Sequence, residues 1–356
     1  VLNVTFSPSG LHVVTSSDDD TARIWEIATG QSVGEPLRHA LDVTSANVSP
    51  NGRWVATSSP DGVAKVWSMK TGKPALEPIK FRGPVTAARF SNDGRSLVIG
   101  SEDQTAQVWT CLAGQPKSEP LMHDDIQLNW ASFSSDARYV VTGGNDQQAR
   151  IWDIGTGKLL TEPLIQGGRP IYAEFTPDDK RLLVTTDNGY LQIWDVATGK
   201  AVGGRYKSSD KITSAQYSAD GSSILVVERY VAKVLDPATL KERFTAKVEH
   251  RDSRARRYIL SGNFNSDGSL FVTAGDDKSA RIWDARTGAP KGEPFMHDDG
   301  VTDAVFSRDG KYIATGSKDR TARFWEVATG KQMTEPMQHV RAVNSVDLSP
   351  DGAYLI

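Results

Sequence analysis

The chain has 356 residues, of which 38% are hydrophobic and 24% charged, and its formal net charge is −3. These values are typical of a globular protein, and the lack of any run of about 18 apolar residues excludes a transmembrane helix. The single cysteine, Cys111, excludes internal disulfides and cysteine-based metal sites, which agrees with a reducing cytosol. We therefore expect a cytoplasmic protein with no membrane partner. Because the chain starts at Val1 without a methionine and stops inside an expected strand, we also expect further domains in the same parent chain.

A tryptophan recurs at intervals of 41 to 43 residues along most of the chain. One interval is about twice as long, and Leu235, 41 residues after Trp194, takes the missing position. Such a fixed period is the signature of a repeat architecture, so the chain divides into eight units of one kind. The tryptophans of the repeat are Trp25, Trp67, Trp109, Trp152, Trp194, Trp283 and Trp325.

Each unit has one internal layout, which is clearest in the last complete unit. Alternating apolar and polar residues at Val301–Phe306 predict a first strand, and turn residues at 307–310 end it. A second strand over 311–315, a polar turn around Asp319 and a third strand ending at Trp325 follow. A Thr-Gly hairpin at 329–330 then leads to a weaker fourth strand. Four short strands in a unit of about 42 residues are typical of a propeller blade.

A proline stands eleven residues after the tryptophan in six units, directly after a glutamate. Proline cannot donate to a ladder of backbone hydrogen bonds, so a sheet tolerates it on an edge strand and not in the middle. The fourth strand is therefore expected to be the outermost strand of each blade. The six prolines are Pro36, Pro78, Pro120, Pro163, Pro294 and Pro336.

These patterns predict an all-β fold, a β-propeller of four-stranded antiparallel blades. The plainest arrangement has eight blades over residues 1–341, with a degenerate sixth repeat. Residues 342–356 then start a ninth repeat, as an overhang or as part of a continuing array. The alternative is a propeller of seven blades followed by part of a second propeller.

The units resemble WD repeats, and in particular the closely self-similar WD repeats of bacterial multidomain proteins. The resemblance covers essentially the whole chain and rests on a His before the first strand, a Ser or Thr on the second strand, an Asp in the following turn, and the Trp. It implies that these four side chains hydrogen-bond to one another and lock the blade. The residues of this structural blade network are His39, Asp61 and Trp67; His123, Asp146 and Trp152; and His297, Ser317, Asp319 and Trp325.

A recurrent His, Ser and Asp also matches the residue types of a hydrolase triad, but a catalytic site occurs once, whereas this set recurs. A buried polar network explains the recurrence better. Thr-Gly-Lys likewise recurs as a hairpin, without the full phosphate-binding motif. The acidic triplet at 18–20 lacks the glycine and the distal glutamate of a calcium loop. We therefore predict no catalytic residue, no metal site and no cofactor.

The sixth unit lacks the His, the turn Asp and the Trp, and positive charge gathers around it. Residues 200–260 hold 13 Lys or Arg against 7 Asp or Glu, and an arginine-rich insertion lengthens the loop between the sixth and seventh units. The resemblance implies that this loop lies on the same face as the turn after the second strand. The candidate partner-binding residues are Glu228, Arg229, Tyr230, Arg251, Arg254, Arg256 and Arg257.

Clustered guanidinium groups suit a carboxylate or phosphate ligand. We predict a non-catalytic scaffold or sensor module that binds other macromolecules, mainly proteins, through the loop face of the propeller, with an acidic protein segment as the first candidate ligand. The alternative is a binder of nucleic acid or another polyanion through the basic 200–260 sector. A more remote alternative is an enzyme with a site in the central channel.

Overall fold

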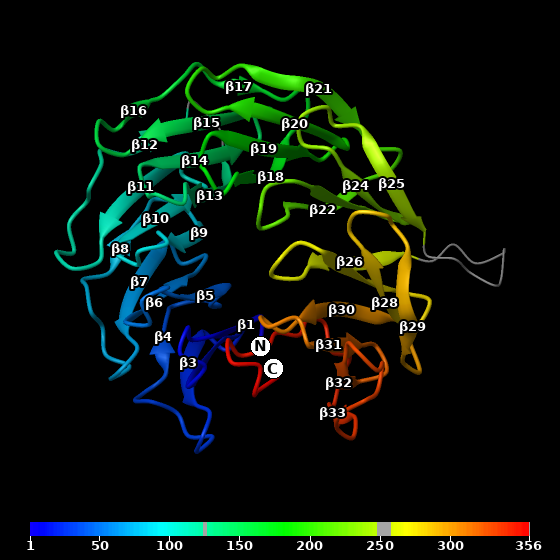
Figure 1. Cartoon of the computed structure of the whole chain (residues 1–356). Helices are drawn as coiled ribbons and strands as arrows, with labels where there is room; N and C mark the ends of the chain where they lie inside the picture. Colours follow the sequence, from blue (N-terminus) through cyan, green and yellow to red (C-terminus); the bar gives the residue numbers. More distant parts are fainter. Residues whose placement is uncertain (124–126, 248–257, 356) are drawn as a thin grey trace. The chain divides into compact units, whose positions relative to one another are not determined.

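The computed structural model describes residues 1–123, 127–247 and 258–355 (Figure 1). Every regular element in these residues is a β-strand, and the strands form eight antiparallel sheets. Seven sheets have four strands; in the remaining one the fourth strand is divided into β16 (Lys158–Leu159) and β17 (Leu164–Ile165), both paired with β15 (Gln148–Asp153). The eight β-propeller blades predicted from the repeat are confirmed.

The chain divides into two compact units, which we describe separately. Unit 1 comprises residues 1–186 and 194–201, and unit 2 comprises residues 187–193 and 202–356. Unit 1 contains the first four blades, whose other strands are β1 (Asn3–Phe6), β2 (His12–Ser16), β3 (Thr21–Glu26), β4 (Leu37–Arg38), β5 (Ser45–Val48), β6 (Trp54–Ser58), β7 (Val63–Ser68), β8 (Ile79–Lys80), β9 (Val85–Phe90), β10 (Ser96–Ser101), β11 (Thr105–Thr110), β12 (Leu121–Met122), β13 (Leu128–Phe133) and β14 (Tyr139–Gly144).

The fifth blade contains residues of both units, and unit 2 contains the last three blades. The strands of the fifth blade are β18 (Pro170–Phe175), β19 (Arg181–Thr186), β20 (Tyr190–Asp195) and β21 (Ala201–Lys207). The strands of the last three blades are β22 (Ile212–Tyr217), β23 (Ile224–Glu228), β24 (Val231–Leu235), β25 (Glu242–Lys247), β26 (Ile259–Phe264), β27 (Leu270–Gly275), β28 (Ser279–Asp284), β29 (Pro290–Met296), β30 (Val301–Phe306), β31 (Tyr312–Ser317), β32 (Thr321–Glu326) and β33 (Met337–Gln338).

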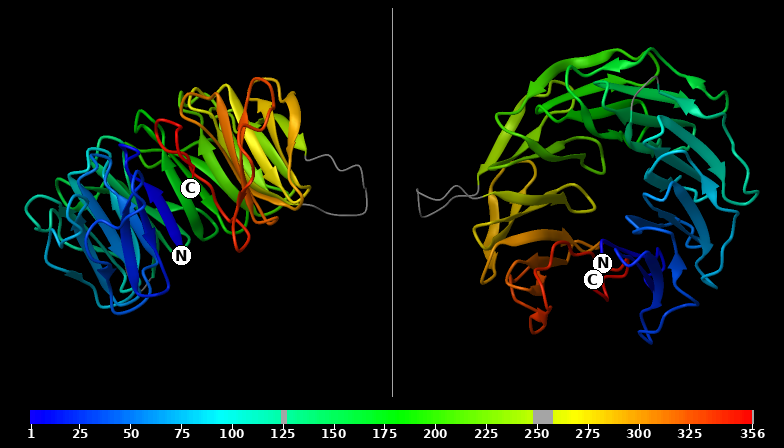
Figure 2. Two further views of the ribbon diagram at one scale, coloured as in Figure 1. Left: turned by 90° about the horizontal axis from the view of Figure 1, so that it is seen from below. Right: turned by 180° about the vertical axis from the view of Figure 1, so that it is seen from behind.

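The strands of each blade pair in chain order, so the first and fourth strands form its edges. Within unit 1, the first strands β5, β9 and β13 lie on the inner side and the fourth strands β8 and β12 at the periphery (Figures 1 and 2). In the second blade the third strand contains the repeat tryptophan Trp67, which pairs with Val55 of the second strand. The prediction that the fourth strand is outermost is confirmed.

The Thr-Gly step of the repeat turns the chain between the third and fourth strands. In the second blade, the N–H of Gly72 donates to the carbonyl of Ser68 over 2.9 Å, and Gly72 has a φ of +65°. A side chain is strained at this φ, and a Cβ there would lie 2.6 Å from the carbonyl oxygen of Val33 in the first blade. Glycine is therefore required both by the turn and by the close approach of the neighbouring blade.

The fourth strands differ in length along the chain. In the first three blades and the eighth, the fourth strand has two residues and begins directly after the repeat proline, as β4 does after Pro36. In the fifth, sixth and seventh blades it has seven, six and seven residues. Only the seventh of these three blades keeps the repeat proline, Pro294. The outer edges of the fifth and sixth blades are therefore long and lack that proline.

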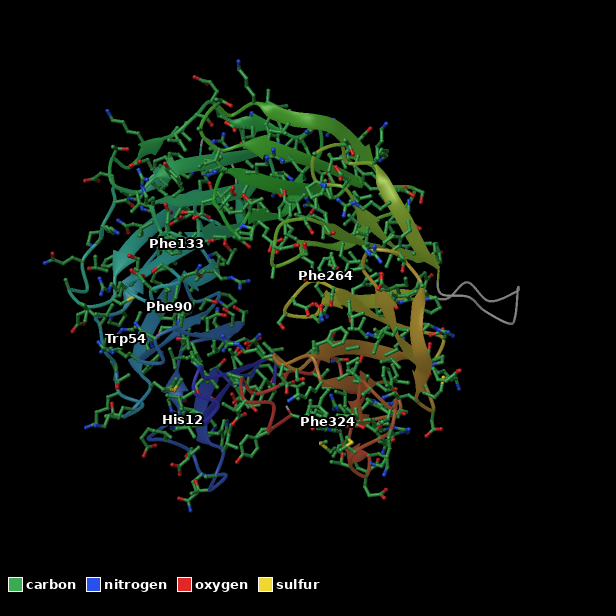
Figure 3. All side chains as sticks on the ribbon, viewed as in Figure 1. His12, Trp54, Phe90, Phe133, Phe264 and Phe324 are labelled. Atoms are coloured by element: carbon green, nitrogen blue, oxygen red, sulfur yellow. The ribbon has the colours of Figure 1, made fainter. Side chains whose placement is uncertain are left out.

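Hydrophobic side chains fill the space between neighbouring blades. The cluster between the second and third blades joins Val66 and Ile79 of one sheet to Leu97 and Ile99 of the next, all of them buried. Trp54 and Phe90, labelled in Figure 3, pack against this cluster. A blade therefore buries its faces against adjacent blades, as expected of a repeat that cannot form a core alone.

Polar side chains link the first strands of neighbouring blades. In unit 1, the Asn47 amide donates to the carbonyl of Ala88 over 2.9 Å, and in unit 2 the Asn263 amide donates to the carbonyl of Ala304 over 2.9 Å. The chain beyond residue 341 continues this arrangement, because the N–H of Val343 donates to Ser317 and Thr302 donates to the carbonyl of Val343. Residues 342–355 therefore lie against the eighth blade where the first strand of another blade would lie.

Candidate functional site

The second and eighth blades contain the same buried polar network. His39 lies between the carboxylate of Asp61, 3.0 Å from Nδ1, and the hydroxyl of Thr57, 2.8 Å from Nε2. The indole of Trp67 donates to the same hydroxyl over 2.9 Å. In the eighth blade, the corresponding distances are 2.9, 2.7 and 2.8 Å for His297, Asp319, Thr315 and Trp325. The His, Asp and Trp selected from the sequence are thus brought together in both blades.

The hydroxyl of this network is not the one selected from the sequence. Ser317, which we assigned to it, accepts the N–H of Asp319 over 3.1 Å and donates to the carbonyl of Gly300 over 3.0 Å, so it holds the turn. The hydroxyl between His297 and Trp325 belongs to Thr315, two residues earlier. Thr315 lies inside the strand β31, whereas Ser317 ends it, and this places only Thr315 beside the indole.

The fourth blade has a variant of the network. His123 Nε2 lies 2.7 Å from the hydroxyl of Thr142, to which Trp152 donates over 2.8 Å. However, Nδ1 of His123 lies 3.0 Å from the guanidinium of Arg150, and that guanidinium in turn pairs with Asp146. The predicted direct contact between His123 and Asp146 is therefore replaced by one through Arg150. Burial, and after it the charge of Arg150, lowers the pKa of His123 to about 4.

The fifth blade has neither the His nor the Thr of the network. Val184 occupies the position of the hydroxyl, and Gln166 occupies the position of the His. The side-chain carbonyl of Gln166 accepts the indole N–H of Trp194 directly over 3.3 Å, and its amide donates to the carbonyl of Leu164 over 3.0 Å. One glutamine therefore accepts the indole N–H that a threonine hydroxyl accepts in the second, fourth and eighth blades.

The sixth blade replaces the network with a buried ion-pair cluster. Leu235 stands in the place of the Trp, and the second strand, β23, ends with Glu228, which is 1% exposed. Tyr206 donates to one carboxylate oxygen of Glu228 over 2.5 Å, and Ser209 donates to the other over 2.8 Å. Lys233 lies 3.1 Å from the same carboxylate. Glu228 is therefore corrected from a candidate partner-binding residue to a buried structural one.

The contacts of this cluster determine the protonation states of Lys233 and Tyr206. Burial disfavours the ammonium of Lys233, but hydrogen bonds to Glu242, Tyr206 and Glu228 outweigh burial and raise its pKa. Burial, followed by the hydrogen bond to Glu228, raises the pKa of the Tyr206 phenol. Lys233 is thus charged and Tyr206 neutral across the physiological range. The sequence analysis selected neither residue. The one signal in the sequence was that Tyr206 occupies the repeat position that the buried Leu37 occupies in the first blade.

The remaining described candidates lie at the surface. Arg229 has a side chain that is 46% exposed, and its guanidinium lies 5.5 Å from the ring centroid of Tyr258 and 4.0 Å from the carboxylate of Asp210. The rings of Tyr230 and Tyr258 lie 5.4 Å apart. We call Arg229, Tyr230 and Tyr258 the sixth-blade patch. The other candidates, Arg251, Arg254, Arg256 and Arg257, lie outside the described residues.

A pocket of about 590 Å³ lies along the first strands of unit 1. Trp130, Phe133, Tyr172, Arg89 and Glu174 are among its lining residues, and Glu174 is the one acid among the described residues that line it. Burial, followed by the charge of Glu174, raises the pKa of Tyr172 to about 12. No three His, Cys, Asp or Glu side chains gather into a metal site in the part of the chain that the structure describes.

The fold and these networks define a class of protein, the repeat-built β-propellers whose blades are locked by internal His, Thr and Trp contacts. Within this class, the chain belongs to the WD40 family. The family model "WD domain, G-beta repeat" matches residues 1–26, 30–68, 78–110, 117–153, 250–284 and 290–326, together more than half of the chain. The matched segments leave out all strands of the fifth and sixth blades, in which the network is replaced.

Comparison with other proteins shows the fold. No curated protein matches the chain. Among solved structures, it is similar to the crystal structure of the computationally designed Ika8 protein, with 24% sequence identity and a TM-score of 0.69. The similarity covers 91% of this chain and 95% of that chain. Among the described residues, no helix has the length and apolar character needed to cross a membrane.

Proposed function

We propose that this chain is a non-catalytic binding module that holds an acidic segment of a partner protein at its sixth blade. The observation that carries this proposal is the sixth-blade patch, in which an exposed guanidinium lies beside two tyrosine rings. An arginine over an aromatic ring is oriented before it meets a ligand, and its planar fork suits a carboxylate. WD40 propellers commonly hold protein partners, and the exposed cation and rings of the patch support the proposal that binding occurs there.

The contacts around the patch support a binding role. The backbone carbonyl of Arg229 accepts the N–H of Ile259 over 2.8 Å, so the turn that holds Arg229 is tied to the start of the next blade. Tyr258 is 38% exposed, and Lys211, which follows Asp210 in the chain, is exposed as well. Asp210 is the one acid that an ion pair within the described residues places beside Arg229, at the long distance of 4.0 Å. A weak internal pair leaves the guanidinium available for a stronger carboxylate ligand.

The experiment is a fluorescence anisotropy titration of a labelled octaglutamate peptide with the full chain. We expect binding that weakens as salt is raised, and a loss of about tenfold in affinity for Arg229→Ser, since one charge-assisted contact is removed. Arg286→Ser is the matched control. This exposed arginine lies in the hairpin between β28 and β29 of the seventh blade and is not part of the sixth-blade patch. Unchanged affinity of Arg229→Ser would overturn the proposal.

A second probe separates the protein ligand from the polyanion alternative. A labelled single-stranded DNA oligomer is titrated in the same buffer, because aromatic and basic surfaces also bind single strands. We expect the peptide to bind more tightly than the DNA at physiological salt. Tighter binding of the DNA, with the same loss in Arg229→Ser, would contradict the assignment of a protein partner.

A further inference from the structure

The outer edge of the fifth blade differs from the edges of the regular blades. Its fourth strand, β21, has seven residues, and Arg205 occupies the position that is proline in six other units. In four of those units the proline and a strand of two residues protect the edge from pairing with another strand, and in the seventh blade the proline stands within β29 itself. β21 has neither protection, so it presents a strand edge that the regular blades do not.

The direction of the backbone groups along β21 follows from its hydrogen bonds. The carbonyl of Gly204 accepts the side-chain amide of Gln192 over 3.2 Å, and the N–H of Ser208 donates to the carbonyl of Gly189 over 2.9 Å. Both groups therefore point toward the body of the blade. Because successive residues of a strand alternate, the backbone N–H and C=O groups of Arg205 and Lys207 point outward.

The proline of the other units independently supports this direction. Pro294 occupies the same position in β29, another fourth strand of seven residues, and it has no N–H to donate. The blade therefore does not need an N–H at this position for its own ladder. In β21 the equivalent N–H belongs to Arg205 and is free to pair with an added strand.

The side chains of Arg205 and Lys207 give this edge a positive charge. They stand two residues apart, so they project from the same face of the strand. Both are exposed, and their charged groups lie 3.8 and 4.2 Å from the ring centroid of Tyr190. The tyrosine ring thus holds two cations side by side along the edge.

The residue between them fixes the strand to the rest of unit 2. Tyr206 projects from the other face, is 7% exposed, and donates to the buried Glu228 over 2.5 Å. Lys233 donates to the Tyr206 hydroxyl over 3.0 Å. This anchor reduces the freedom of Arg205 and Lys207 before a ligand arrives, and such preorganisation favours affinity.

We propose that β21 binds an extended acidic segment of a partner protein as an added β-strand, with carboxylates two residues apart in the partner facing Arg205 and Lys207. Main-chain hydrogen bonds to the outward groups of Arg205 and Lys207 supply the pairing, and the cross-strand charges select the acidic sequence. This inference rests on the proposed function, since it specifies the conformation and the second contact of the acidic partner.

The test compares Arg205→Ala with Arg205→Pro in binding a labelled peptide of alternating Glu and Thr. The first variant removes only the charge, whereas the second also removes the outward N–H. We expect Arg205→Pro to bind about tenfold more weakly than Arg205→Ala, as for the loss of a main-chain hydrogen bond and of the fit between the two strands. In the seventh blade, Pro294 stands at the equivalent position within a fourth strand of seven residues, so a strand of this length accommodates proline there. Equal affinities of the two variants would overturn the inference.

Two further measurements separate the possible failures. Amide hydrogen exchange on the peptide complex is expected to slow at Arg205 and Lys207, and unchanged exchange at both would also overturn the added strand. Arg229→Ser is titrated with the same peptide in parallel. If Arg229→Ser weakens binding while Arg205→Pro and Arg205→Ala are alike, the proposed function stands and the added strand is wrong.

Discussion

The recurrent polar residues of this chain hydrogen-bond to one another. In the second and eighth blades, His, Asp, Thr and Trp form closed networks, and burial lowers the pKa of His39 and His297 against the opposing effect of the neighbouring carboxylates. A buried, satisfied network specifies how strands pack and leaves no polar group for chemistry. The candidates for binding are therefore the residues that do not belong to such a network.

The hydroxyl assignment can be tested with three variants of the eighth blade. Thr315→Val leaves the indole of Trp325 and a nitrogen of His297 without a partner, and we expect a loss of about 2 kcal/mol in the free energy of unfolding. Ser317→Ala, the matched control, is expected to cost about 1 kcal/mol because only turn hydrogen bonds are lost. Denaturant unfolding measures both, and a larger cost for Ser317→Ala would contradict the assignment.

The fifth blade suggests how the same defect could be repaired. Gln166 and Val184 satisfy Trp194 without His or Thr. The double variant His297→Gln with Thr315→Val reproduces this pair in the eighth blade. We expect it to be about 1 kcal/mol more stable than Thr315→Val alone, because the indole regains an acceptor. A double variant no more stable than the single one would show that the glutamine needs other features of the fifth blade.

The two kinds of histidine environment predict different tautomers. In His39 the carboxylate of Asp61 requires a proton on Nδ1, so Nε2 accepts from Thr57. In His123 the guanidinium of Arg150 can only donate, so Nδ1 is unprotonated and Nε2 donates to Thr142. Nitrogen-15 chemical shifts at neutral pH distinguish the two forms. The same tautomer at both positions would contradict the described role of Arg150.

His123 also predicts a pH dependence of stability. Its pKa is about 4 in the folded chain, below the value of about 6.5 for an unfolded histidine. The stabilising contribution is therefore complete above pH 6.5 and is lost as the pH falls toward 4, because the unfolded chain takes up the proton first. Between pH 7 and 5, we expect His123→Gln to reduce the fall in unfolding free energy by about 2 kcal/mol. An unchanged pH profile of this variant would contradict the buried neutral state.

At the scale of single elements, the regular features of the repeat could be predicted from the sequence, whereas the contacts of a divergent blade could not. The sequence predicts the four strands of each blade and the outermost place of the fourth, because strand alternation, turn residues and proline are local signals. It does not predict that Glu228 is buried in an ion-pair cluster, since that residue ends β23 next to a turn and resembles an exposed acid. Only the packing of Tyr206, Lys233 and Ser209 around it shows that it is buried.

Two other assignments failed for similar physical reasons. Thr315 and Ser317 both carry a hydroxyl in the same strand, and only the placement of the indole distinguishes them. An arginine stands four residues after the turn Asp in several units, but the one at Arg150 turns toward a histidine. Such choices depend on side-chain geometry across strands, which spacing along the chain does not encode.

The cluster of the sixth blade predicts a large effect from one buried cation. Lys233→Met leaves Glu228 buried without its ion pair, and we expect a loss of about 3 to 5 kcal/mol in the free energy of unfolding. Lys241→Met, which changes an exposed lysine of the same blade, is the control and is expected to cost less than about 0.5 kcal/mol. Thermal and denaturant unfolding measure both, and equal effects would show that the pair contributes little.

At the scale of the whole molecule, two independent observations single out the same stretch of chain. The WD40 family pattern is matched on both sides of residues 154–249 and not within them. The same stretch contains the blades in which the network is replaced and the long edge strands β21 and β25. Together they favour a division of labour in which the regular blades provide stability and the divergent blades bind.

Hydrogen exchange measured along the full chain, with and without a saturating acidic peptide, tests this division most directly. Our account predicts slower exchange at β21 and at the turn that holds Arg229, and unchanged exchange in the first three blades. Protection confined to the first three blades, or protection spread evenly over all of them, would contradict the account.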